Sequence, residues 1–219
     1  MPYQRIFATA GLGLSQSRQK IGVFGGAFDP PHNAHIALAK AAIVELALDT
    51  LHVIPTGQAW HKARNLSPAI HRLAMARLAF QDMPCVVVDD REIKRAGPTF
   101  TIDTLQALQL ENPGAQLYLL MGADQFAAFE QWHQWREIMK VAIICIAARA
   151  QFTLATGQFD AQNMPKNAVV TLQMPQMAVS ATQIRQLLSA GLGENQAIAD
   201  LLPVPVAGYI AQHQLYKAS

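Results

Sequence analysis

The 219-residue chain has few charges and little cysteine. Charged side chains make up 15% of its residues, the net charge is +2, and no run of Lys and Arg forms a basic stripe, so we expect no nucleic-acid partner. Its two cysteines, Cys85 and Cys145, each lie in an apolar run, which indicates small core hydrophobes in a reducing, cytoplasmic compartment. A disulfide between neighbouring strands stays open. No apolar run approaches the roughly 20 residues of a membrane span, so no membrane partner is expected.

Apolar residues make up 51% of the chain, which predicts a packed globular protein. The length suffices for one well-buried α/β domain, and no internal repeat or low-complexity tract divides it. The segment Ile6–Leu14 faintly resembles the apolar part of a signal peptide, but two glycines interrupt it. We therefore expect an N-terminal extension over residues 1–19 and a single domain over 20–219, with a C-terminal helical part from about residue 180.

Apolar runs typical of buried strands alternate with helical patterns along the chain. The runs are Ile21–Phe24, Leu51–Ile54, Cys85–Val88, Gln116–Met121, Val141–Ala147 and Ala168–Leu172. The helical patterns are Asn33–Leu48, Pro68–Phe80, Ile102–Glu111, Gln125 to Lys140 with a break near Trp132, Ser180–Ser189 and Val206–Gln214. This alternation predicts an α/β fold: a Rossmann-like, doubly wound and mostly parallel sheet with helices on both faces and a small C-terminal helical part.

Local features refine this picture. The segments Val86–Val88 and Ala142–Ile144 are apolar at every position, which favours central places in the sheet. Ser67 followed by Pro68 predicts a serine N-cap with proline at the first helical position.

The most informative stretch runs from Gly22 to His35, where a strand is expected to turn into a helix. Its glycine pair, Gly25-Gly26, allows close approach of a ligand to the backbone, and His32 and His35 fall at the helix N-terminus, which favours phosphate. A plain tight turn and solvated histidines remain the alternative. The glycines are not spaced as in the GxGxxG motif, so hydride transfer gains little support. In a doubly wound sheet, ligands bind at the carboxyl ends of the strands, where this turn lies.

A second signal is the segment Val179–Arg185. Ser180 suits an N-cap, Thr182 falls in the first helical turn, and Arg185 comes one turn later. Together they would cradle phosphate through helix N–H groups, two hydroxyls and a guanidinium. An ordinary capped surface helix with an exposed Arg185 fits the segment equally well.

Taken together, the two stretches resemble the (H/T)xGH and ISSTxxR signatures of the nucleotidylyltransferase superfamily. Further segments resemble its bacterial nicotinate mononucleotide adenylyltransferase branch, in the order in which that family has them. These segments are Val53–Pro55 with His61-Lys62, Gly97–Leu105, Met121–Asp124, Trp132–Trp135 and Leu202–Tyr216. Two positions depart from the pattern, Ala34 where the family usually has Gly and Ala181 where it usually has Ser. Both replacements are small, and the resemblance spans nearly the whole chain.

The resemblance implies transfer of the adenylyl group of ATP to nicotinate mononucleotide, giving nicotinate adenine dinucleotide and pyrophosphate in NAD biosynthesis. The attacking group is the mononucleotide's own anionic phosphate, so the reaction requires neither a general base nor a covalent intermediate. It requires positioning of two anions and stabilisation of charge at the α-phosphate. His32, His35 and Arg185 are the implied catalytic residues, and Mg²⁺ is expected to enter with ATP.

The resemblance also implies two sets of binding residues. Those for ATP are Phe24, Gly25, Gly26, His35, Asp124, Ser180, Thr182 and Arg185. Those for the mononucleotide are Lys62, Phe100, Thr101, Trp132 and His133. Trp132 would stack on the pyridine ring, and backbone N–H groups near Thr101 and His133 would donate hydrogen bonds to its carboxylate. The purely structural alternatives are an N-cap role for Asp124, a solvated Lys62 and tryptophans packed in the core.

No metal site is expected, because His32, His35 and His61 have no cysteine or acidic partner at a suitable spacing. Three other functions remain open: an enzyme specific for nicotinamide mononucleotide or accepting both mononucleotides, a phosphopantetheine adenylyltransferase, and a non-catalytic nucleotide sensor. The Trp132 segment and Gly97–Leu105 argue against the pantetheine branch, and the intact catalytic set argues against the sensor. The sequence is compatible with a homo-oligomer.

Overall fold

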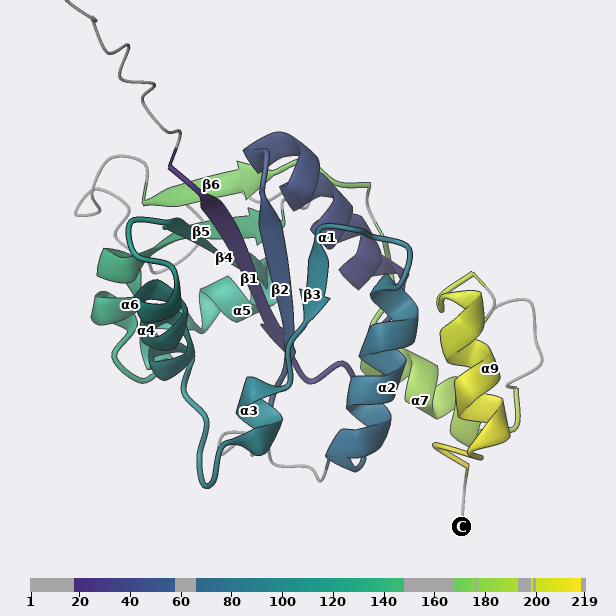
Figure 1. Cartoon of the computed structure of the whole chain (residues 1–219). Helices are drawn as coiled ribbons and strands as arrows, with labels where there is room; N and C mark the ends of the chain where they lie inside the picture. The colour runs from purple at the N-terminus through teal and green to yellow at the C-terminus, as the bar shows by residue number, and fades with distance from the viewer. Residues whose placement is uncertain are drawn as a thin grey trace, which may run out of the picture.

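The computed structural model describes residues 18–57, 66–147, 168–175, 177–192, 198 and 200–217. Within these ranges six strands form one sheet in the order β3-β2-β1-β4-β5-β6, and every neighbouring pair is parallel (Figure 1). The strand order reverses between β1 and β4. The strands are β1 Lys20–Gly26, β2 Thr50–Pro55, β3 Val86–Val88, β4 Gln116–Gly122, β5 Ala142–Ala147 and β6 Val169–Leu172. The predicted doubly wound α/β fold is confirmed.

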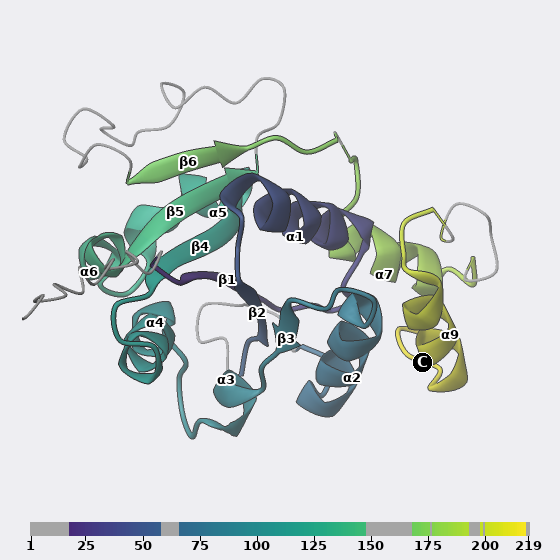
Figure 2. The ribbon, with the colours of Figure 1, turned by 45° about the horizontal axis from the view of Figure 1, so that its top comes forward.

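Helices cover both faces of the sheet, as Figure 2 shows for α1 and α4. One core cluster joins the sheet to α4, α5 and α6, and a second joins its other face to α1 and the end of α2. The helices are α1 Asn33–Leu46, α2 Ala69–Phe80, α3 Arg91–Lys94, α4 Thr101–Glu111, α5 Ala123–Ala127, the 3-10 turn η1 Phe129–Gln131, α6 Trp135–Val141, α7 Ala181–Ser189 and α9 Val204–Gln212. Among the described residues, no helix has the length and apolar character that a bilayer crossing requires.

The C-terminal helices pack against α2 instead of the sheet. Met75 of α2, Ile184 of α7, and Val206 and Ile210 of α9 form a third buried cluster. Figures 1 and 2 both show α2, α7 and α9 gathered at one end of the molecule. This end lies close to the turn that follows β1, because Arg185 of α7 contacts Asp29 in that turn.

The expected central position of β3 is wrong. Among the described strands its single neighbour is β2, so β3 is an edge strand, and Val87 is 46% exposed. Three valines suit a strand wherever it lies, and a three-residue edge strand offers little unpaired backbone to other chains. The run Ala142–Ile144 does lie inside the sheet, because β5 is paired on both sides.

Several helix ends also differ from the predictions. Pro68, not Ser67, is the N-cap residue of α2, and the Ser67 N–H donates to the carboxylate of Asp29 instead. The break predicted near Trp132 is confirmed, because Trp132 is extended and Gln134 takes a left-handed conformation with φ 53°, but the segment from Gln125 to Lys140 forms three short pieces instead of two. The four-residue helix α3 has too few residues to show a helical period and was missed.

Candidate active site

The turn after β1 places both motif histidines at the N-terminus of α1. His32 is the N-cap residue, and its backbone N–H donates to Nδ1 of His35 at 3.1 Å. Because Nδ1 of His35 accepts this bond, the ring is neutral and its proton lies on Nε2, the nitrogen that would donate to a phosphate oxygen. The two rings stack with centroids 3.7 Å apart. The histidines therefore form one preorganised pair at a helix terminus that favours anions.

His32 is buried, with 7% of its surface exposed. Its Nδ1 has no hydrogen-bond partner among the described residues. Burial lowers the pKa of the imidazole from 6.5 to about 4, because the charged form loses its hydration. His32 is consequently neutral near pH 7, and a bound phosphate would meet a directed dipole and not a full charge.

The glycine pair has two different roles. A Cβ atom on Gly26 would lie 3.1 Å from the ring of Phe28, so Gly26 makes room for that buried side chain. Gly25 is exposed, and a Cβ atom there would meet nothing within 4 Å. Phe28 packs edge-on against Phe24 at 5.4 Å and against the His35 ring at 5.1 Å. The open backbone at Gly25 is therefore the part of the turn that a ligand could approach.

Arg185 joins the late motif to the early one. Its Nη1 donates to the backbone carbonyl of Asp29 at 2.7 Å, and its Nη2 donates to Oγ1 of Thr182 at 3.0 Å. Ser180 caps α7, because its Oγ accepts from the N–H of Gln183 at 3.2 Å. Arg185 is half-buried, so the alternative of a freely exposed arginine is wrong. Ser180 and Thr182 are exposed near this guanidinium.

Asp124 lies just beyond the carboxyl end of β4, next to β1 in the sheet. It is exposed in the first turn of α5, whose N-cap residue is Gly122. The alternative N-cap role for Asp124 is therefore wrong. The residue therefore lies at the carboxyl ends of the strands, where the strand order reverses between β1 and β4. Ligands usually bind at this place in doubly wound sheets.

The residues expected around the pyridine ring come from α4 and the η1–α6 connection. The Phe100 and His133 rings contact with centroids 4.3 Å apart, and Thr101 is the first residue of α4. Trp132 is half-buried and packs edge-on against Phe129 at 5.6 Å. Trp135 also packs on Phe129, and the Arg136 guanidinium covers its ring at 4.3 Å. Lys62 and His61 lie outside the described residues.

Sequence reasoning missed a buried polar cluster between α3 and α4. The Thr104 hydroxyl donates to Oε1 of Glu92 at 2.8 Å, and burial raises the pKa of this carboxyl. A Cβ atom on Gly57 would collide with the backbone carbonyl of Glu92. Because Glu92 belongs to the short helix α3, no periodicity in the sequence could place it inside the protein.

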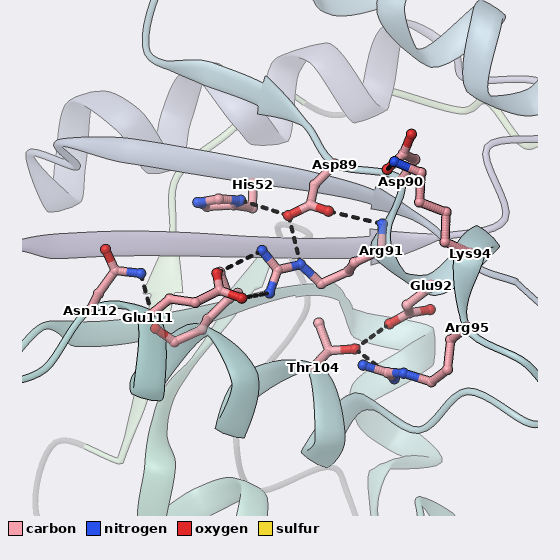
Figure 3. Close-up of polar contacts among 11 residues, drawn as sticks. His52, Asp89, Asp90, Arg91, Glu92, Lys94, Arg95, Thr104, Glu111 and Asn112 are labelled. Atoms are coloured by element: carbon pink, nitrogen blue, oxygen red, sulfur yellow. Dashed lines mark hydrogen bonds and ion pairs between the residues drawn. The ribbon is translucent and has the colours of Figure 1, made fainter.

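A second polar network holds α3 to β2 and α4, as Figure 3 shows. The Asp89 carboxylate lies 3.1 Å from Nδ1 of His52 and 2.7 Å from Nε of Arg91. The two Nη atoms of Arg91 donate to the two carboxylate oxygens of Glu111. Burial alone would raise the pKa of Asp89, but the hydrogen bonds from His52 and Arg91 outweigh it and lower the pKa to about 2. The network fixes the segment that leads to Phe100 and Thr101.

Within the described ranges, no three His, Cys, Asp or Glu residues are grouped so that they could hold a metal ion. Both cysteines are free thiols, and Cys145 is buried in the core as expected.

Comparison with known proteins identifies the family. Residues 23–187 match the cytidylyltransferase-like family model. A probable nicotinate-nucleotide adenylyltransferase of Albidiferax ferrireducens is 53% identical over 201 residues, covering 92% of this chain and 100% of that protein. One of Methylibium petroleiphilum is 39% identical over 203 residues, covering 91% and 93%.

A solved structure has the same fold. The nicotinic acid mononucleotide adenylyltransferase of Plasmodium falciparum, complexed with NaAD, superposes with a TM-score of 0.73 and 20% sequence identity, over 91% of this chain and 98% of that one. The family match and the two relatives agree with the motifs. The chain therefore belongs to the cytidylyltransferase-like family and, within it, to the nicotinate-nucleotide adenylyltransferases.

Proposed function

We propose that the protein transfers the adenylyl group of ATP to nicotinate mononucleotide, as a cytoplasmic step of NAD biosynthesis. The observation that carries this proposal is the bond from Arg185 to the Asp29 carbonyl, because it brings the arginine of one motif to the turn that holds the histidines of the other. The relatives named for this reaction support it. The packing of α7 and α9 on α2 supports a single catalytic domain from residue 20 onward.

The reaction is a direct in-line displacement. An anionic oxygen of the mononucleotide phosphate attacks the α-phosphorus of ATP, the new P–O bond forms, and the bond to the bridging oxygen of the β-phosphate breaks. Pyrophosphate leaves with that electron pair. No proton has to be removed from the nucleophile, so the protein's task is to position two anions and stabilise the developing charge.

The neutral histidines and the arginine divide this task. His35 donates from Nε2 to the α-phosphate oxygens, and His32 adds a second neutral donor beside it. Arg185, with Thr182, Ser180 and the N-terminus of α7, holds the β- and γ-phosphates and stabilises the leaving pyrophosphate. Phe24, Gly25, Gly26 and Asp124 border the adenosine part of ATP.

The mononucleotide lies toward α4. Trp132 stacks on the pyridine ring beside the Phe100–His133 pair, and backbone N–H groups near Thr101 and His133 receive its carboxylate. Lys62 is proposed to contact the mononucleotide phosphate. The negative charge that distinguishes the acid from the amide thus meets the positive end of the α4 dipole.

Among the residues that the structure describes, the donors around the turn offer no site for a resident metal ion. Asp29, a carboxylate of the turn, accepts from Tyr216 and Ser67, and the described residues contain no ligand cluster. Mg²⁺ is therefore proposed to enter on the phosphates of ATP, where it neutralises charge, while the protein contacts the remaining oxygens.

Pyrophosphate release from MgATP, measured with nicotinate mononucleotide and nicotinamide mononucleotide in parallel, tests the function. A strong preference for the acid is expected. Comparable rates would assign the protein a dual specificity, and no release with either would favour a nucleotide sensor.

A further inference from the structure

Asp29 connects four segments that are distant in the sequence. Its side chain is 1% exposed, Oδ1 accepts from the Tyr216 hydroxyl at 2.6 Å, and Oδ2 accepts from the Ser67 N–H at 3.2 Å. Its backbone carbonyl accepts from Arg185. One buried residue thus contacts the C-terminal segment, the start of α2 and the phosphate-binding arginine, while belonging to the turn after β1.

Asp29 is also rigidly linked to the catalytic histidines. Only Pro30 and Pro31 separate it from His32, and both prolines are buried. Proline fixes its own φ and restricts the residue before it, so this short segment has little freedom to absorb a movement of Asp29. A displacement of Asp29 would therefore reach His32 on one side and Arg185 on the other.

Tyr216 is well suited to hold Asp29 in place. Burial and, after it, the negative charge of Asp29 raise the pKa of the Tyr216 hydroxyl, which therefore remains a donor. A distance of 2.6 Å is characteristic of a hydroxyl bonded to a carboxylate, which is about twice as strong as a bond between neutral groups. The same hydroxyl also contacts Sδ of Met75 in the C-terminal cluster, at 4.0 Å.

We propose that Tyr216 is a positioning residue for adenylyl transfer: its hydroxyl acts through Asp29 to keep Arg185 and the histidine pair aligned with the phosphates. The inference rests on the proposed function and extends it to the C-terminal segment. Without the hydroxyl, Asp29 loses its shortest described hydrogen bond, and the two halves of the phosphate site lose a common anchor. Misalignment of this kind affects the transition state more than ground-state binding.

The test compares Tyr216→Phe with Tyr209→Phe in the full-length protein. Tyr209 is a matched control, because its hydroxyl bonds His71 on α2 and not Asp29. Pyrophosphate release gives kcat and KM for both substrates, and thermal unfolding shows that each variant is folded at the assay temperature. Tyr216→Phe is expected to lower kcat about tenfold or more while changing either KM by about twofold at most. Tyr209→Phe is expected to retain both parameters.

A double-mutant cycle tests the route through Asp29. In an Asp29→Asn background, Tyr216→Phe is expected to cause little further loss of kcat, because the carboxylate it acts on is already gone. An unchanged kcat in Tyr216→Phe, with or without a lower Tm, would overturn the inference alone. An undiminished effect in the Asp29→Asn background would also overturn it. An inactive wild-type protein would contradict the proposed function, and this inference with it.

Discussion

The Arg185 guanidinium donates to the Asp29 carbonyl at 2.7 Å, across 156 positions of sequence. This bond fixes α7 against the turn between β1 and α1, so the late motif and the early motif lie beside each other. Taken separately, each motif fits an ordinary helix start as well as a phosphate site. Joined at the point where the strand order reverses, they are proposed to form one phosphate site with neutral and cationic donors.

Arg185→Lys should lower kcat about a hundredfold. Lysine keeps the positive charge but cannot bond the Asp29 carbonyl and the Thr182 hydroxyl at once in the planar geometry of a guanidinium. Steady-state pyrophosphate release measures the effect. Arg77→Lys is the control, because Arg77 is largely exposed and only loosely paired with Asp90 at 3.7 Å. Full activity in Arg185→Lys would remove the arginine from the catalytic set.

The burial of His32 makes stability depend on pH in the acid range. The folded-state pKa is about 4 against an ordinary value of 6.5, so the unfolded chain binds the proton first as pH falls. Stability should therefore decrease between about pH 6.5 and 4, by about 3 kcal/mol at most. Urea unfolding at several pH values measures this loss, and His32→Gln should show a shallower dependence. Parallel curves for the two proteins would mean that His32 titrates normally.

Trp132→Ala should raise KM for nicotinate mononucleotide about fivefold, because stacking on the pyridine ring is worth roughly 1 kcal/mol. KM for ATP should stay nearly unchanged. Trp135→Ala is the matched control: its ring is covered by Arg136 and packs on Phe129, so we expect a lower Tm and an unaltered KM. Equal losses for both substrates in Trp132→Ala would indicate a packing role for Trp132 instead.

Substitution by alanine should have different effects at two glycines: it should lower stability at Gly57 and weaken ATP binding at Gly25. Gly57→Ala should destabilise the protein by about 1–3 kcal/mol, because the added methyl collides with the Glu92 carbonyl. Gly25→Ala should leave stability unchanged and weaken ATP binding, because its methyl would lie where the nucleotide is proposed to approach. Urea unfolding and calorimetric titration with MgATP separate the two effects. A stable Gly57→Ala protein would show that the segment relaxes freely.

The strands were predictable because continuous apolar runs such as Ile21–Phe24 and Val141–Ala147 need burial on both faces of a parallel sheet. The order of the strands was not predictable: Val86–Val88 has the all-apolar pattern of a central strand, yet it lies at the edge of the sheet. Short helices such as α3 also cannot be predicted from periodicity, because four residues complete barely one helical turn.

The proximity of the motif residues was predictable, but the residues that hold them in place were not. His32, His35 and Arg185 carry recognisable spacing, and the structure brings all three to the turn after β1. Asp29 and Tyr216 pair across 187 positions, and nothing in the sequence marks a long-range hydrogen bond. The predicted N-cap role of Ser67 was wrong, and the hydrogen bond from its backbone N–H to the distant Asp29 carboxylate was not predictable either.

The most direct measurement follows the α-phosphate itself. The purified protein is incubated with Mg²⁺ and ATP labelled at the α-phosphorus, with and without nicotinate mononucleotide, and the labelled products are separated. We expect the label to move into the dinucleotide only when the mononucleotide is present, with unlabelled pyrophosphate released in equal amount. Label recovered as free AMP, or left in ATP in both reactions, would contradict this expectation.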